Sequence, residues 1–247
     1  EPELYSNILA STLRDLATLL VKQESFQEAE RVFLEVIRLH EDLENLDDLA
    51  LTTNLLRSLH EKMGKDSLIS AEFLQEINLW RKLHEKGKEK AIPILAETCY
   101  NYGNFLGKRG KREEAEEFLL ESIKLLTNLE QKSGSQESLL IHCILHLGII
   151  HREMERMEDA RDTFKNALYA LERAQALNHE KMALFTATIH LQLYMTCKEL
   201  LRFTEAARHC TIALPILREL NANGKYTDII CRVEAFLREA KVEYEPF

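Results

Sequence analysis

The stretch that decides the fold is residues 141–173, IHCILHLGIIHREMERMEDARDTFKNALYALER. Apolar residues recur at helical spacing in both halves of this stretch. They are Ile144, Leu147, Gly148 and Ile150 in the first half, and Ala160, Phe164, Ala167 and Leu168 in the second. Gly148 and Ala160 are small, so two helices can approach closely there and Phe164 can pack between them. The stretch therefore predicts a helical hairpin with an apolar face that it cannot bury alone.

Comparable hairpins recur along the whole chain of 247 residues. We expect them at about residues 3–44, 46–85, 92–130, 136–175 and 181–220, followed by a single helix at about 226–242. The residues at equivalent core positions are Phe33, Phe73, Leu119, Phe164 and Cys210, which are 40, 46, 45 and 46 residues apart. A supersecondary unit repeated at nearly constant spacing predicts one stacked, all-α array over residues 1–247, closed by a C-terminal capping helix.

These hairpins resemble the tetratricopeptide repeat, whose pattern is W-x2-L-G-x2-Y followed by A-x3-F. Leu147-Gly148 matches the leucine-glycine pair, Ala160 the later alanine and Phe164 the aromatic residue, while Ile144 and His151 replace the tryptophan and the tyrosine. The resemblance implies an α-solenoid, a right-handed superhelix of five antiparallel hairpins. The period near 45 residues exceeds the usual 34, so we expect a long-helix variant.

The resemblance is strong in the first, third and fourth hairpins and weaker in the other two. In the second hairpin Arg57 takes the place of the glycine, which leaves close contact between its two helices in question. In the fifth hairpin Tyr194 takes the glycine's place and Cys210 that of the aromatic residue.

In proteins of this family the first helix of each hairpin lines the concave surface, so the resemblance implies a peptide-binding groove there. The first-helix residues expected to face it are Arg14, Asn54, Tyr100, Asn101, Asn104, His142, His146, Arg152, Met195 and Lys198. Asparagine can both donate to and accept from a peptide backbone, and Arg152 and Lys198 favour an acidic ligand. The resemblance therefore implies a scaffold that binds a protein or peptide. A ligand- or peptide-sensing regulatory module of a larger protein, and a merely solvated surface, are the alternatives.

Other chemistry has little support in the sequence. His142 and His146 are four residues apart, a spacing that can hold a transition metal, but no third ligand is apparent and we expect no metal. The segment 107–112, GKRGKR, lacks the spacing of a phosphate-binding loop and reads as the turn of the third hairpin. No catalytic constellation or cofactor fingerprint is present, so we expect neither an enzyme nor a cofactor.

Composition restricts the partners. The net charge is −9, and an acidic protein repels nucleic-acid phosphates, so we expect no nucleic-acid partner. No run of eighteen apolar residues predicts a membrane span, and we expect no membrane partner. The five cysteines are odd in number and form no C-x-x-C motif, which predicts free thiols in a reducing, cytoplasmic setting. The oligomeric state stays open.

Overall fold

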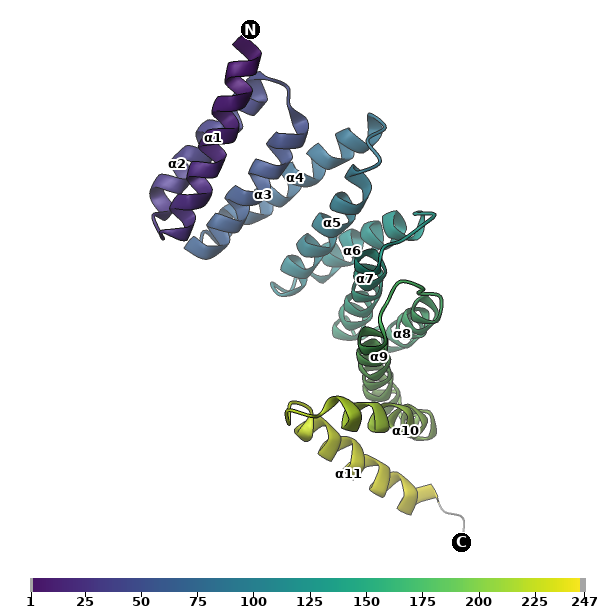
Figure 1. The fold of residues 1–247 in the computed structure, drawn as a ribbon. Helices are drawn as coiled ribbons and strands as arrows, with labels where there is room; N and C mark the ends of the chain where they lie inside the picture. The colour runs from purple at the N-terminus through teal and green to yellow at the C-terminus, as the bar shows by residue number, and fades with distance from the viewer. Residues whose placement is uncertain (1, 245–247) are drawn as a thin grey trace. The chain divides into compact units, whose positions relative to one another are not determined.

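The computed structural model describes the backbone of residues 2–244 and the side chains of residues 5–240. Over these residues the chain forms eleven α-helices in succession (Figure 1). They are α1 (Pro2–Lys22), α2 (Phe26–Asp42), α3 (Leu46–Met63), α4 (Asp66–Glu85), α5 (Ala91–Gly107), α6 (Arg112–Thr127), α7 (Gly134–Glu153), α8 (Met157–Glu172), α9 (His179–Glu199), α10 (Phe203–Leu220) and α11 (Thr227–Tyr244). The five expected hairpins correspond to α1–α2, α3–α4, α5–α6, α7–α8 and α9–α10.

The chain divides into two compact units, Glu1–Tyr102 and Gly103–Phe247, and the division falls inside α5. In the N-terminal unit α1 packs on α2, α2 on α3, and α3 on α4. In the C-terminal unit the same neighbour-to-neighbour packing runs from α6 to α11. Within each unit these helices thus pack on the helices next to them in sequence. That all five hairpins form one continuous array stays a prediction.

The turn inside each hairpin uses the same backbone conformation. One residue per turn adopts a positive φ, and this left-handed geometry reverses the chain. The turn residues are Glu24, Gly64, Gly110, Glu155 and Leu201, with φ values of 61°, 67°, 75°, 60° and 58°. Their spacing equals that of the core positions, so the turn is as much a part of the repeat as the core. The segment 107–112 is indeed the turn between α5 and α6.

Phe164 is fully buried between α7 and α8, as its place in the pattern predicts. A Cβ atom added to Gly148 would lie only 2.4 Å from the Phe164 ring. The equivalent residues Phe33, Phe73 and Leu119 are 1 to 2% exposed. The small residue on the first helix therefore makes room for the large one on the second.

Close contact does occur in the second hairpin, in spite of Arg57. The Arg57 side chain is buried, and its guanidinium lies 4.0 Å above the centre of the Phe73 ring. Its Nε donates to the buried Glu76 carboxylate at 3.3 Å, which compensates the buried charge. A planar guanidinium can lie flat against an aromatic ring. Arginine thus fills the space over Phe73 where other hairpins place a small residue.

The final helix covers the end of the C-terminal unit. Val233 and Phe236 of α11 pack against Cys197 of α9 and Cys210 of α10 in one buried cluster. Ile230 joins a second cluster on α9 and α10. Helix α11 therefore occupies the position expected of a capping helix.

Candidate functional site

Two of the groove residues expected in the N-terminal unit are engaged in contacts between helices. Arg14 on α1 donates to the Asp48 carboxylate on α3 at 2.7 Å, and Asn54 on α3 donates to Glu76 on α4 at 3.0 Å. Burial works against ionisation of Asp48, but the hydrogen bonds from Arg14 and Asn45 hold its pKa below the ordinary value. Arg14 and Asn54 therefore have structural contacts, and a ligand would have to compete for them.

The other two expected residues of that unit lie on α5. Tyr100 is half-buried and Asn101 is exposed. The amide of Asn101 is therefore accessible to a ligand.

In the C-terminal unit, Asn104 and His146 line the same small hollow of about 150 Å³ between the end of α5 and α7. Burial is the main cause that lowers the pKa of His146 to about 4, so its ring is neutral at pH 7. His142, one turn earlier on α7, is exposed, and its ring centre lies 5.0 Å from that of Phe185 on α9. A neutral imidazole and an amide beside each other can exchange hydrogen bonds with a peptide backbone.

The remaining three expected residues gather around a larger hollow of about 700 Å³ between α9 and α11. Its lining residues are Leu191, Gln192, Tyr194, Met195, Lys198, Glu199, Ile229, Arg232 and Val233. Arg152 of α7 donates to Oε1 of Gln192 at 3.0 Å and so lies at its edge. Met195 and Lys198 are exposed. This hollow combines an apolar wall with three cationic side chains and one carboxylate, that of Glu199.

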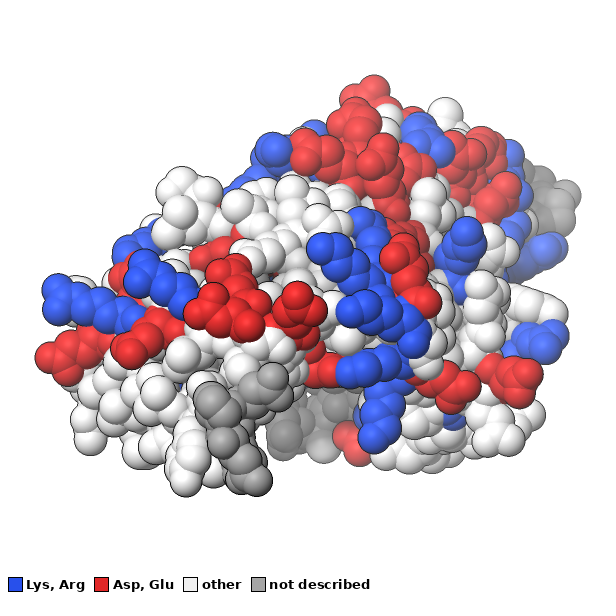
Figure 2. All heavy atoms as spheres, turned by 90° about the horizontal axis from the view of Figure 1, so that it is seen from above, with Lys and Arg blue, Asp and Glu red and all other residues white. Residues whose placement is uncertain are grey.

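Ile229 and Arg232 also belong to this hollow, although the sequence predicts only a capping role for their helix, α11. Both side chains are exposed. On the face of the molecule seen in Figure 2, small groups of basic side chains lie beside groups of acidic ones. Basic and acidic side chains are thus interspersed on that face.

Two further hollows lie at the ends of helices and contain none of the expected residues. One, of about 810 Å³, is lined by parts of α2, α3 and α4. The other, of about 790 Å³, is lined by α6, α7, α8 and their connections. Size alone therefore does not select the groove that the sequence predicts.

Polar side chains also recur where one hairpin packs on the next. His60 on α3 contacts Glu72 through Nδ1 at 2.5 Å and Glu30 of the preceding hairpin through Nε2 at 3.0 Å. At the equivalent position on α7, His151 contacts Thr163 through Nδ1 at 3.0 Å and Glu116 through Nε2 at 2.9 Å. We call these sets the seam clusters, since they lie where a hairpin packs on the one before it.

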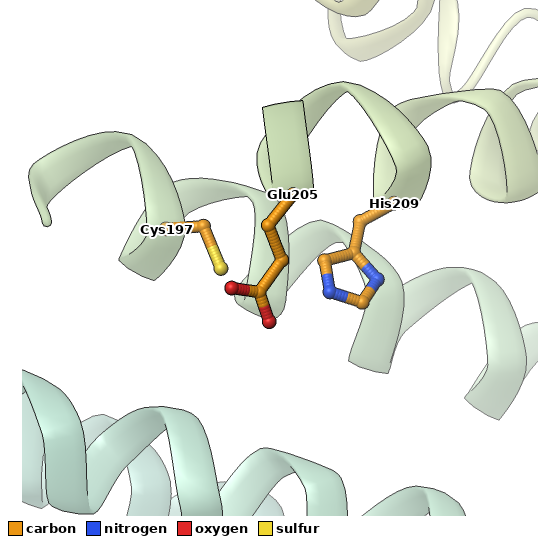
Figure 3. A group of neighbouring side chains, drawn as sticks. All are labelled: Cys197, Glu205 and His209. Carbon is orange, nitrogen blue, oxygen red and sulfur yellow. The ribbon is translucent and has the colours of Figure 1, made fainter. Parts of the chain in front are cut away.

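The third seam cluster has a different chemistry. Cys197 on α9 occupies the position of His60 and His151, and His209 on α10 that of Glu72 and Thr163. Together with Glu205, one turn before His209, they present a thiol, a carboxylate and an imidazole toward one another (Figure 3). The three nearest ligand atoms lie within 4.8 Å of one another. Among the described residues, this is the group of three or more such side chains that could hold a metal ion.

The third seam cluster is not among the sites that the sequence predicts, although one signal for it is present. Glu205 and His209 are four residues apart and so share a helix face. Cys197, however, lies on a different helix, and no motif spacing links it to them. Alignment of the repeats by their core positions is the signal that places Cys197 and His209 together.

Comparisons with known proteins agree with this architecture. Residues 9–49 and residues 96–125 match models of the tetratricopeptide repeat. These segments fall in the first and third hairpins, which the pattern ranks among the best matched. The chain thus contains tetratricopeptide repeats in these two segments and has an all-α solenoid fold, and repeats of this kind generally form protein-interaction scaffolds.

Solved structures show the same fold at low sequence identity. BtubC (BKLC) from P. vanneervenii is 20% identical, with a TM-score of 0.64 over 89% of this chain and 84% of that one. A putative kinesin light chain with nearly identical repeats from Podospora anserina is 12% identical, with a TM-score of 0.61 over 86% and 97%. The apo form of RapI is 13% identical, with a TM-score of 0.52 over 95% and 71%.

No curated protein sequence matches the chain. In the part of the chain that the structure describes, every helix is too short or too polar to cross a membrane.

Proposed function

We propose that this protein is a non-catalytic, cytoplasmic scaffold that binds an extended peptide or protein segment, and that the hollow between α9 and α11 is its main ligand site. One observation carries the proposal. The repeat pattern alone predicts Met195, Lys198 and Arg152 as groove residues, and all three lie in or at the edge of this hollow.

The lining of the hollow indicates the chemistry of the ligand. Leu191, Ile229 and Val233 offer an apolar wall to which one large side chain of a peptide can bind. Lys198 and Arg232 are exposed, and neither forms an ion pair with another described residue. We infer a peptide that carries an apolar anchor residue next to one or more carboxylates.

Asn104 and His146 support a second contact in the same unit. They lie on α5 and α7, and the hollow they share is only about 150 Å³, too small for a large side chain but suited to a backbone group. A peptide that lies along the first helices would meet this contact and the main hollow in turn. The proposed partner is thus an extended segment rather than a small molecule.

A displayed peptide library provides the test, because it selects ligands without a named partner. We expect the intact chain to select peptides with an apolar residue flanked by Asp or Glu. Met195→Ala, Lys198→Ala and Asn104→Ala should each weaken the binding of a selected peptide by about 1–2 kcal/mol in calorimetry.

The matched controls lie on a second helix, α6. Leu120→Ala removes an exposed apolar side chain, and Lys124→Ala removes an exposed lysine. Both should leave the affinity unchanged. Loss of binding from the α6 variants, with none from the α5 and α9 variants, would place the ligand on the second helices and overturn the proposal.

A further inference from the structure

The three seam clusters differ in how completely the ring nitrogens of their histidines are satisfied. In the first two, a histidine uses both ring nitrogens, with partners at 2.5 and 3.0 Å for His60 and at 3.0 and 2.9 Å for His151. In the third, no hydrogen bond among the described residues joins Cys197 to His209. The Nε2 atom of His209 is buried and has no hydrogen-bond partner. A buried polar atom without a partner costs about 1–3 kcal/mol, so its presence calls for an explanation, and a bound ligand is one.

We propose that Cys197, Glu205 and His209 bind a divalent transition-metal ion, and that zinc is the ion they fit best. A thiolate, an imidazole and a carboxylate are the three donor types that zinc takes in proteins. A hard ion would need a different set of donors, since Mg²⁺ and Ca²⁺ prefer oxygen ligands alone. Three protein ligands leave the fourth tetrahedral position to water.

The backbone already brings the three donors to one place. Glu205 and His209 are one turn apart on α10, and Cys197 points to the same space from α9 (Figure 3). Their ligand atoms lie within 4.8 Å of one another. Metal–ligand bonds of about 2.0–2.3 Å would bring those atoms to about 3.3–3.8 Å apart. Rotamer adjustments of about 1 Å are enough to close the site.

His209 is also oriented as a ligand would be. Its Nδ1 lies 2.9 Å from Nδ1 of His190 on α9. When Nδ1 of His209 carries the proton, it donates to His190, and the lone pair on Nε2 is left to face Glu205 and Cys197. Histidines that bind metals regularly donate their second ring N–H to a hydrogen-bond acceptor, which fixes both tautomer and ring orientation. Here the acceptor is the Nδ1 atom of His190.

Basic side chains border the site and affect it in two ways. Lys165 approaches Oε1 of Glu205 at 3.1 Å, with Arg161 at 3.9 Å, and Arg202 lies 3.8 Å from Oε2. They keep the carboxylate ionised, which favours binding, and they repel an incoming cation. Oε2 has only the longer contact, so it is the oxygen available to a metal.

Charge and protons balance on binding. The thiol of Cys197 loses one proton to solvent and becomes the thiolate ligand, and Glu205 is already ionised. One dipositive ion with one thiolate and one carboxylate makes a neutral site. Neutrality matters because the surroundings are partly buried and a net charge there would be costly. The metal would join α9 to α10 beside the seam with α8.

The test uses the intact chain with Co²⁺ as a spectroscopic probe for Zn²⁺. Cys231 is the one exposed cysteine among those described, so Cys231→Ser provides a background without an accessible surface thiol. In that background, Co²⁺ should produce a thiolate-to-cobalt charge-transfer band, and one equivalent of Zn²⁺ should abolish it. Binding of Zn²⁺ should also raise the thermal unfolding midpoint.

Matched variants identify the ligands. Cys197→Ser should remove the band. Cys210→Ser changes a second fully buried cysteine, which lies on α10, and this variant should retain the band. Glu205→Gln should weaken Zn²⁺ binding at least about tenfold, since even changes to the partners of metal ligands cost that much. Glu205 is half-buried, so this variant tests the site even if Cys197→Ser fails to fold. An absent band, a band that survives Cys197→Ser, or a folded Glu205→Gln with unchanged affinity would overturn the proposal.

Discussion

At the scale of single residues, the hairpins follow a rule of complementary size rather than a fixed motif. Each hairpin has one core position on its first helix and one on its second. Where one of these helices carries a small residue, the other carries a larger one that packs against it. Four pairs follow this rule, namely Ala17 with Phe33, Gly103 with Leu119, Gly148 with Phe164, and Tyr194 with Cys210. The second hairpin departs from it, because Arg57 and Phe73 are both large and the guanidinium lies over the ring. In the fifth hairpin the large residue has moved to the first helix. Its weak match to the family pattern is therefore an inversion of one pair and not a loss of packing.

The Gly148 pair can be tested directly. Gly148→Ala places a methyl group 2.4 Å from the Phe164 ring, which has no space to withdraw. Overpacking of this kind costs about 1–3 kcal/mol, and the alanine's higher helix propensity offsets only about 1 kcal/mol of it. We expect urea unfolding to show a net loss of stability.

Gly107→Ala is the matched control. The only close approach of the added methyl there would be to the end of the Ile150 side chain, at 2.9 Å, and that side chain can rotate away; the Cβ of Ala115, at 4.0 Å, is in ordinary contact. Its stability should change by less than about 0.5 kcal/mol. Equal effects at the two glycines would contradict the size-pair explanation.

At the scale of elements, the repeated turn stores strain in three of the five hairpins. Glycine adopts the left-handed conformation at Gly64 and Gly110, but Glu24, Glu155 and Leu201 adopt it with a side chain. For a residue with a Cβ this conformation costs about 1–2 kcal/mol. The turn geometry is kept even where the sequence does not favour it, because packing of the two helices fixes it.

Leu201 offers the clearest measurement, since its side chain is 73% exposed and contributes little burial. Leu201→Gly should raise the free energy of unfolding by about 0.5–1 kcal/mol. This gain is the backbone strain that glycine relieves, minus the cost of the greater conformational entropy that glycine gives the unfolded chain. Leu201→Ala keeps a Cβ at φ 58° and should give almost none of this gain. If alanine stabilised the protein as much as glycine does, exposure of the leucine and not backbone strain would be the cause.

The capping helix makes a second prediction at this scale. Ending the chain after Asn223 removes α11 and exposes the apolar surface around Cys210 and Leu217, which Val233 and Ile230 now cover. Repeat arrays need such a cap for solubility. We expect size-exclusion chromatography to show aggregation or circular dichroism to show lost helicity. A monomeric, fully helical truncated protein would disprove the capping role.

Elements are easier to predict from the sequence than sites. Helical periodicity and turn spacing are local properties of the sequence. The hairpin expected at residues 181–220, for example, is observed as helices α9 (His179–Glu199) and α10 (Phe203–Leu220). The contacts of Arg14 and Asn54 could not be predicted, because Asp48 and Glu76 lie on other helices. The meeting of Cys197 and His209 in the third seam cluster depends on the register between α9 and α10, which the sequence indicates only when the repeats are aligned with one another. Register is a tertiary property that no single helix encodes.

At the scale of the whole molecule, the net charge and the charge of the proposed site have opposite signs. The chain carries −9, and a mean field of that sign repels an acidic peptide. The hollow between α9 and α11 carries Lys198 and Arg232, which would contact the peptide directly. At an ionic strength of 0.1 M the Debye length is about 10 Å, so contact charges act strongly while distant ones are largely screened.

Attraction by the contact charges and repulsion by the net charge predict opposite changes in peptide affinity as salt is raised. If Lys198 and Arg232 dominate, a selected acidic peptide should bind more weakly as salt is raised from about 0.05 M to about 0.5 M, because the attraction is screened. Calorimetry at several salt concentrations measures this dependence. The double variant Lys198→Ala/Arg232→Ala should lose most of it, whereas Lys124→Ala on α6 should retain it. If instead salt strengthens binding, repulsion by the net negative charge governs the encounter. An acidic ligand would then be the wrong partner for this hollow.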